Sequence, residues 1–319
     1  MSLAPPDLLD RKLLFVTGKG GVGKTSIAAA LATLAASRGK RTLVCEVDAK
    51  GNLADFFEAD PTRFEPRELE PNLFAMSMNT EASLREYLKI QLRVPLIARI
   101  GPLARSFDFV AQAAPGVREI LTVGKLCWEV RKQSYDIVIV DAPATGHIVG
   151  QLAAPQAINE LVKVGVIRDQ TAWMVDILSD PATTGAMIVA APEEMPVNET
   201  LELAERIREE TTVDLAGVVV NRVLPELFGR GEEEIFGRLR EPALVGALSD
   251  ELGPAVTSVL DAAQLAVTLR RSRAEHLTRL REALPPGIEL LYLPYLFTRE
   301  HGVRATRQLA DALAGELGH

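Results

Sequence analysis

The chain has 319 residues, a formal net charge of −8 and 47% hydrophobic residues. This balance is ordinary for a globular α/β protein, and the acidic charge disfavours broad binding to nucleic acid or anionic lipid. No stretch reaches the roughly 18 consecutive apolar residues of a membrane span, and residues 1–10 show neither the basic region nor the apolar core of a signal peptide. We therefore expect a cytoplasmic protein with no stable membrane insertion and no nucleic-acid partner.

Only two cysteines, Cys45 and Cys127, occur, and they lie far apart in the sequence. They are too few for a disulfide framework, or for a zinc site with four cysteine ligands within one chain. We expect both to be reduced thiols with a mainly structural role.

Short runs rich in Val, Ile and Leu alternate with longer segments of helical spacing, which is typical of buried parallel strands joined by crossover helices. The pattern predicts an α/β fold with a doubly wound, mostly parallel sheet, in a single domain over residues 1–319. Strands are predicted at Lys12–Thr17, Arg41–Val47, Leu73–Met78, Ile137–Val140, Ala186–Ala190, Gly217–Val220 and Glu289–Leu293. Helices are predicted at Lys24–Arg38, Val197–Glu210 and Val303–Leu317, and Gly253–Ala283 is either one long helix or a pair.

Two segments interrupt this alternation, at residues 80–131 and 153–181, and both carry apolar residues at helical spacing. They predict a helical subdomain over one end of the sheet. Two interpretations remain open: the segments pack only on the core and on each other, or they also form a surface for a partner or client.

A glycine-rich run follows the first predicted strand and precedes an Ala-rich helix, and it fits the phosphate-loop pattern G-x-x-x-x-G-K-[ST]. Glycines let backbone N–H groups approach phosphate oxygens, and the helix N-terminus adds further N–H groups and a positive dipole end. Lys24 would reach the β and γ phosphates of ATP, and Thr25 would bind Mg²⁺. The predicted nucleotide-binding residues here are Gly18, Lys19, Gly20, Gly21, Val22, Gly23, Lys24, Thr25 and Ser26.

Two carboxylates follow predicted strands at the sheet edge where ligands bind in such folds. Asp48 follows the second strand and could orient the attacking water or hold a water on Mg²⁺; a turn or helix-capping role is the alternative. Asp141 closes the apolar run 137–140, which is how an acid is presented to the metal or its water shell. The small residues that follow it, up to His147, suit a loop that senses the γ-phosphate.

The phosphate loop resembles the deviant loop shared by MinD and ParA ATPases, the nitrogenase iron protein and the arsenical-pump ATPases, because a lysine, Lys19, follows its first glycine. In that group the first lysine reaches across a dimer to the nucleotide of the other subunit. The resemblance implies that nucleotide binding and dimerisation are coupled, with Lys19 stabilising transition-state charge much as an arginine finger does.

Two further motifs narrow the resemblance to the family of arsenical-pump and tail-anchored-protein-targeting ATPases. The family's switch II reads Asp-Thr-Ala-Pro-Thr-Gly-His, and this chain keeps its length, its first residue and its last three. Its switch I begins Asp-Pro-Ala-His-Asn, of which only the first and last residues persist here. The switch residues implied by the resemblance are Asp48, Asn52, Pro143, Thr145, Gly146 and His147.

Other matches lie outside the switches. Asn221 corresponds to a strand-end residue that contacts the adenine in this family, and Pro294 and Tyr295 resemble the loop that closes over the base. Without the resemblance, Asn221 could equally be a turn residue and Tyr295 a core aromatic. Residues 114–116 and Glu119 resemble a family element within the helical region.

The resemblance implies an ATPase that uses ATP and Mg²⁺, with Lys19, Lys24, Asp48 and Asp141 in catalysis, and hydrolysis that opens and closes a dimer. The dimer could pair two copies of this chain or this chain with a paralogous subunit, and a protein client or partner is expected. The chain lacks the Cys-x-x-Cys zinc site of the targeting ATPases and the cysteine set that binds metalloid in the arsenical pumps. The alternatives are a nucleotide-gated binding module with negligible hydrolysis, a metalloid or anion pump subunit, or another small-molecule enzyme.

Overall fold

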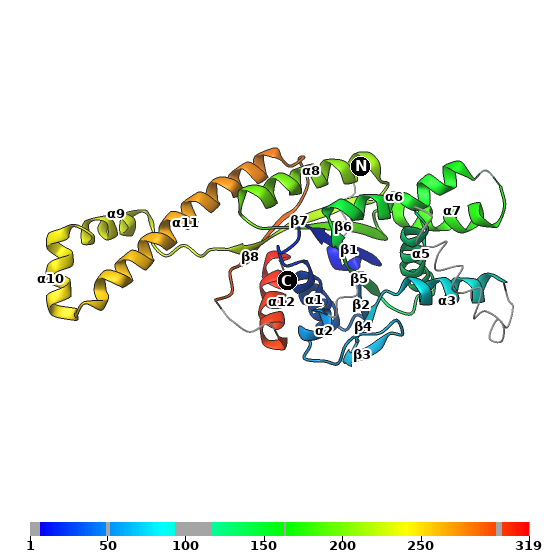
Figure 1. The fold of residues 1–319 in the computed structure, drawn as a ribbon, viewed down its shortest axis with the longest axis horizontal. Helices are drawn as coiled ribbons and strands as arrows, with labels where there is room; N and C mark the ends of the chain where they lie inside the picture. The colour runs from blue at the N-terminus through cyan, green and yellow to red at the C-terminus, as the bar shows by residue number, and fades with distance from the viewer. Residues whose placement is uncertain (1–6, 49–51, 93–115, 163, 298–301, 319) are drawn as a thin grey trace.

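The computed structural model describes residues 7–48, 52–92, 116–162, 164–297 and 302–318. In this part of the chain, one sheet holds eight strands in the order β3-β4-β2-β5-β1-β6-β7-β8 (Figure 1). Neighbouring strands pair in parallel, apart from the antiparallel pair β3–β4 at one edge. The strands are β1 (Leu13–Gly18), β2 (Thr42–Glu46), β3 (Arg67–Glu70), β4 (Leu73–Ser77), β5 (Ile137–Ala144), β6 (Thr184–Ala190), β7 (Asp214–Val223) and β8 (Leu290–Pro294).

The sheet confirms the predicted α/β fold and all seven predicted strands. The edge strand β3 was not predicted, because three of its four residues are charged and none is fully buried. Such a strand carries no apolar alternation for a sequence to show, and charged side chains are a common way to protect a sheet edge.

Two hydrophobic cores lie on opposite faces of the sheet. Successive side chains of a strand point to opposite faces, so Leu13 and Phe15 of β1 join one core while Leu14 and Val16 join the other. Helices α5, α6, α7 and α8 cover the first face, and helices α1, α2 and α12 cover the second. Their bounds are α1 (Lys24–Ser37), α2 (Asn52–Asp55), α5 (Val117–Arg131), α6 (Thr145–Leu161), α7 (Val166–Ser179), α8 (Glu194–Glu210) and α12 (Val303–Glu316).

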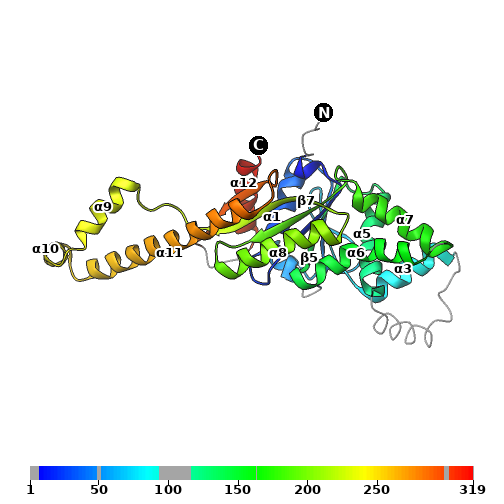
Figure 2. The ribbon, with the colours of Figure 1, turned by 90° about the horizontal axis from the view of Figure 1, so that it is seen from above.

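The two segments expected to be helical lie together at one end of the molecule. Helix α3 (Thr80–Leu92), α5, α6 and α7 pack against one another there (Figures 1 and 2). They enclose an apolar cavity of about 270 Å³ whose lining includes Leu84, Ile120, Trp128 and Trp173. The second segment starts earlier than expected, because α6 begins at Thr145.

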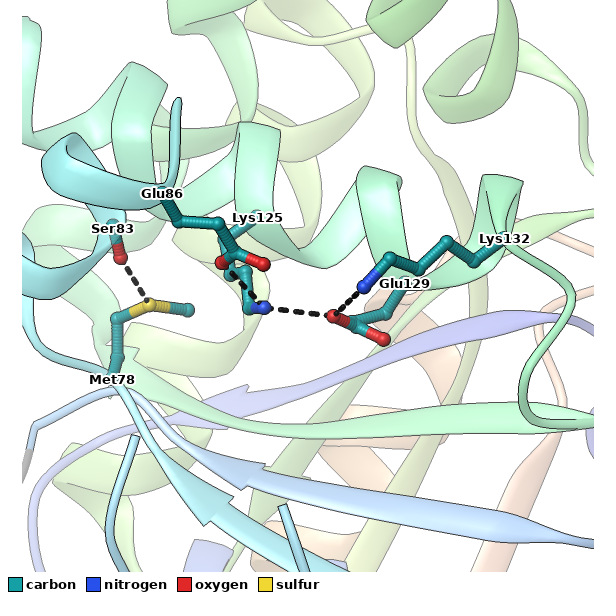
Figure 3. A network of polar contacts seen from close by, with 6 residues as sticks. All are labelled: Met78, Ser83, Glu86, Lys125, Glu129 and Lys132. Carbon is teal, nitrogen blue, oxygen red and sulfur yellow. Dashed lines mark hydrogen bonds and ion pairs between the residues drawn. The ribbon is translucent and has the colours of Figure 1, made fainter. Parts of the chain in front are cut away.

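A buried ion pair fastens α3 to α5 within this helical end (Figure 3). The ammonium of Lys125 on α5 lies 2.6 Å from a carboxylate oxygen of Glu86 on α3 and 2.8 Å from one of Glu129 on α5. Burial alone would lower the pKa of Lys125, but its contacts with Glu129 and Glu86 raise that pKa above its ordinary value. The lysine is therefore charged at neutral pH inside the protein.

Three helices form an arm that extends from the body at the end opposite α3 and α7 (Figures 1 and 2). They are α9 (Arg230–Leu239), α10 (Pro242–Leu252) and α11 (Ala255–Ala283), and α11 is a single helix. Helices α9 and α10 were not predicted. None of the helices in the described residues has the length and apolar character that crossing a membrane demands.

Candidate nucleotide site

The phosphate loop connects the end of β1 to the start of α1. At two of its positions only glycine fits, because neighbouring atoms lie where a Cβ would be. Gly18 has φ +145°, and a Cβ there would lie 2.2 Å from the carbonyl oxygen of Val189. Gly23 has φ +100°, and a Cβ there would lie 2.5 Å from the side-chain nitrogen of Asn221. Any other residue at either position would force the backbone out of this shape. The loop thus leads directly into the N-terminus of α1, and a helix N-terminus is a place where anions commonly bind.

Asn221 supports the loop from the neighbouring strand β7. Its buried side-chain amide donates a hydrogen bond to the carbonyl oxygen of Val22 at 2.9 Å, and its side-chain oxygen accepts one from the Arg222 N–H at 2.9 Å. Asn221 lies within β7, so it is not a turn residue. Its contact with adenine stays a prediction.

The residues expected to bind phosphate and metal meet at the carboxyl ends of β1 and β5. The Thr25 hydroxyl donates a hydrogen bond to Oδ2 of Asp141 at 2.7 Å. The Lys24 ammonium donates to the carbonyl oxygen of Lys19 at 3.3 Å, within the loop itself. The proximity of Thr25 and Asp141 is the arrangement that the sequence pattern predicted for a nucleotide site.

Asp141 is buried in a way that favours a cation nearby. Burial raises the pKa of Asp141 to about 6, while the Thr25 hydrogen bond and the Lys24 charge lower it and the charges of Glu46 and Asp48 raise it. The Oδ1 atom of Asp141 is buried and has no hydrogen-bond partner. A divalent cation beside this carboxylate would offset the burial and the repulsion between the acids.

Glu46 is a neighbour of Asp141 that the sequence analysis missed. The two residues face each other in the register of the β2–β5 pair, and Glu46 is 2% exposed. The available signal was a single acidic residue at the end of an otherwise apolar strand. Its effect on Asp141 is repulsive, which adds to the preference for a cation at the site.

Oxygen donors of this kind suit Mg²⁺, which commonly binds through one or two protein ligands, water and phosphate oxygens. Among the residues described, no group of three or more His, Cys, Asp or Glu side chains could hold a metal by itself. The residues present therefore fit a nucleotide-bound Mg²⁺, held by the Thr25 hydroxyl and, through water, by Asp141 and Asp48.

Switch II differs from the loop that the sequence suggested. Strand β5 continues through Pro143 to Ala144, and α6 begins directly at Thr145. The Thr17 hydroxyl of β1 donates to the carbonyl oxygen of Pro143 at 2.9 Å, which helps to hold the extended strand. The residues predicted to sense the γ-phosphate thus lie on the end of a strand and the first turn of a helix, with Gly146 and His147 exposed.

A polar pocket of about 510 Å³ joins the switch residues to the start of α5. The side-chain oxygen of Gln151, four residues after His147 on α6, is buried and without a hydrogen-bond partner. Of the other switch I residues, Asn52 opens α2, while residues 49–51 lie outside the described part of the chain. The pocket is lined by Val47, Asp48, Arg118, Glu119, Thr122, Pro143, His147 and Gln151.

Lys19 does not point freely into solvent. Its ammonium lies 2.6 Å from Oε1 of Glu199 on α8, and each of the two side chains is 29% exposed. Both partners belong to the same protomer. The fold brings them together because α8 follows β6, the strand beside β1.

The predicted adenine loop follows the end of β8. Pro294 is the last residue of that strand, and the Tyr295 N–H donates to the carbonyl oxygen of Val223 at 2.8 Å. The Tyr295 side chain is 38% exposed, and its ring centroid lies 5.0 Å from that of Phe297. Tyr295 is therefore not a core aromatic, and its contact with the base stays a prediction.

Both cysteines are free and fully buried. Burial raises the pKa of each thiol, so neither is a thiolate at neutral pH. Their burial is compatible with the expected structural role, which stays a prediction.

A family profile described as "Anion-transporting ATPase" matches residues 11–175 and 163–230. The chain belongs to the anion-transporting ATPase family. It is 32% identical over 232 residues to "ATPase BagA" of Mycobacterium tuberculosis (strain ATCC 25618 / H37Rv), covering 69% of this chain and 68% of that protein. It is 26% identical over 277 residues to a "Putative arsenical pump-driving ATPase" of Halobacterium salinarum, covering 76% of this chain and 42% of that protein.

A third relative is the "ATPase ASNA1 homolog" of Entamoeba dispar, with 25% identity over 273 residues that cover 70% of this chain and 82% of the relative. The relatives are named as ATPases, and the family is one of P-loop ATP hydrolases. The resemblance drawn from the phosphate loop and switch II is confirmed.

Proposed function

We propose that this member of the family is a Mg²⁺-dependent ATPase of the cytoplasm whose hydrolysis opens and closes a dimer and controls binding of a protein partner or client. The observation that carries the proposal is the hydrogen bond between Thr25 and Asp141 beside Lys24, at the end of a loop whose shape requires glycine at positions 18 and 23. These groups supply the hydroxyl, the acid and the cation that phosphoryl transfer needs.

Each side chain has a defined part in this proposal. Lys24 binds the β and γ phosphates, and Thr25 and Asp141 hold the metal and its water shell. Asp48, exposed at the end of β2, orients the attacking water. Lys19 acts on the nucleotide of the other protomer. When bound, Mg²⁺ neutralises charge that develops on the phosphate oxygens.

The polar pocket could couple the γ-phosphate to the helical end of the molecule, because it is lined by switch residues and by the start of α5. Asp48 and His147 line this pocket together with Arg118 and Glu119, which lie in the first turn of α5. Because α5 packs on α3, α6 and α7, a shift of either switch would move the helices around the apolar cavity. A partner that binds this helical end would then sense the state of the nucleotide.

One alternative has an observation in its favour. The middle of switch I, residues 49–51, departs from the family pattern, and Asp48 beside it is exposed. A protein that positions water poorly would bind ATP, change shape and hydrolyse it negligibly. A metalloid pump subunit is disfavoured, because both thiols are buried.

Lys19→Ala tests the proposed cross-dimer role. We expect the variant to bind ATP nearly as well as the wild type but to hydrolyse it at least about tenfold more slowly, since the missing charge acts mainly in the transition state. ATP hydrolysis with Mg²⁺ should be measured beside the mass in solution with and without ATP. Lys24→Ala, which removes the main phosphate contact, is the control for total loss.

The mass measurement separates the candidates. A wild-type dimer favoured by ATP, with turnover lost in Lys19→Ala, supports the coupled dimer. A monomer at every ATP concentration, or hydrolysis indifferent to Lys19, contradicts a homodimer that uses this lysine. Addition of a paralogous subunit would then distinguish a heterodimer.

A further inference from the structure

Lys19, the lysine that follows the first glycine of the phosphate loop, forms an ion pair within its own protomer. The distance of 2.6 Å between the Lys19 ammonium and the Glu199 carboxylate is that of a direct, charge-assisted hydrogen bond. The two residues are 180 positions apart, so the fold and not local sequence brings them together. Glu199 lies one turn into α8 and faces the phosphate loop of the same chain.

We propose that Glu199 is a positioning residue that restrains Lys19 and thereby opposes the ATP-bound dimer. The inference rests on the proposed function, in which Lys19 acts across the dimer. In this proposal, the ammonium held 2.6 Å from Glu199 leaves that carboxylate when it reaches a nucleotide in another protomer. Dimer formation would then break the contact with Glu199.

The strength of the contact suits a restraint that ATP can overcome. Both side chains are partly exposed, and exposed ion pairs contribute little because water and salt screen them. A triphosphate carries several negative charges and would outcompete one carboxylate for the ammonium. The pair would thus suppress the dimer without nucleotide, and it would yield once the nucleotide of a second protomer is near.

Glu199→Gln removes the charge and keeps the length of the side chain. We expect this variant to dimerise at an ATP concentration about two- to fivefold lower than the wild type, the factor that corresponds to an exposed ion pair. Glu202→Gln, on the exposed face of the same helix, is the matched control and should leave the midpoint unchanged. The midpoint is measured as mass in solution against ATP concentration at fixed Mg²⁺.

The double variant Lys19→Ala/Glu199→Gln shows whether Glu199 acts through Lys19. If it does, adding Glu199→Gln to Lys19→Ala leaves the dimerisation midpoint unchanged, because the ammonium that Glu199 restrains is gone. An equal shift in both backgrounds would mean a merely structural effect of α8 and would overturn the proposal. A midpoint unchanged in Glu199→Gln alone would also overturn it.

A second readout keeps this inference separable from the proposed function. Acylation of Lys19 by an amine-reactive ester, followed by mass spectrometry of the nucleotide-free protein, reports the restraint without any dimer. Faster labelling in Glu199→Gln than in Glu202→Gln supports the restraint even if ATP induces no dimer, in which case only the proposed function fails. Equal labelling rates would contradict the restraint itself.

Discussion

Asp141→Asn should remove most ATP hydrolysis and at the same time stabilise the nucleotide-free protein. Hydrolysis should fall about 10²- to 10³-fold, because the substitution removes the negative charge that attracts the metal and its water shell. Stability should rise, because burial and the charges of Glu46 and Asp48 all disfavour the ionised Asp141 in the folded state. Opposite effects on activity and stability are typical of a site that stores unfavourable charge for its ligand.

The pH dependence of stability follows from the same carboxylate. The pKa of Asp141 is about 6 in the folded protein against an ordinary value of 3.8 for an aspartate, so the folded state binds more protons between these values. Its contribution to the free energy of unfolding is therefore full below pH 4 and is lost as the pH rises to 6, by up to about 3 kcal/mol. The variant should lack this loss and should exceed the wild type in stability only above about pH 4.

Chemical denaturation at pH 5 and pH 8, without nucleotide, measures this difference. The wild type should also show kcat/KM falling as the pH drops below about 6, since protonated Asp141 no longer attracts the cation. A higher Mg²⁺ concentration should move this fall in kcat/KM to lower pH. A variant less stable than the wild type at pH 8 would show that Asp141 is a structural acid, with no surplus charge to be relieved.

Local spacing was sufficient to predict the phosphate loop and most of the sheet. Gly18 and Gly23 are required by their own backbone angles and by one close neighbour each, so the pattern in the sequence matches a geometric need. The first four residues of β1 and of β5 are buried apolar runs, and Asp141 directly follows the run in β5. Asp141 meets Thr25 there, in the first turn of the helix after the phosphate loop. A motif that follows a strand can be placed from the sequence, because the apolar run of the strand can itself be predicted.

Contacts between distant segments could not be predicted in this way. Glu46 lies beside Asp141 only because of the register of β2 against β5. Glu199 meets Lys19 only because β6 pairs with β1 and places α8 beside the phosphate loop. Glu46 offered only the weak signal of one acidic residue at the end of a strand, and Glu199 offered none, since an acidic residue on a helix is usually solvated.

The arm shows a different limit of sequence interpretation. Helix α10 has no buried residue, so it carries no apolar stripe that faces a core. Helical propensity without such a stripe is a weak signal. By contrast, residues 253–283 were predicted to be helical, as one helix or a pair, because their length gives many turns over which helical spacing can repeat; the structure has the single helix α11 there.

Lys125→Met should destabilise the protein strongly, because it removes a buried positive charge. Lys125 is 6% exposed and is the closest cation to Glu129, whose side chain is 5% exposed. Methionine keeps the apolar stem but leaves a buried carboxylate without its main partner, which costs about 3–5 kcal/mol. The raised pKa of Lys125 means that this contribution is complete at neutral pH and is lost only as the pH rises above the ordinary range of lysine.

Lys132→Met is the matched control, because Lys132 also contacts Glu129, at 3.4 Å, but is 39% exposed. Its effect should stay within about 1 kcal/mol, as for exposed ion pairs. Urea denaturation of both variants at pH 7 gives the comparison, and Lys125→Met/Glu129→Gln should recover part of the loss by removing the unpaired charge. Equal stability of the two single variants would mean that water reaches Glu129 and that the ion pair does not fasten α3 to α5. Since α3 and α5 enclose the apolar cavity, loss of this fastening should also loosen the surface on which the proposed partner binds.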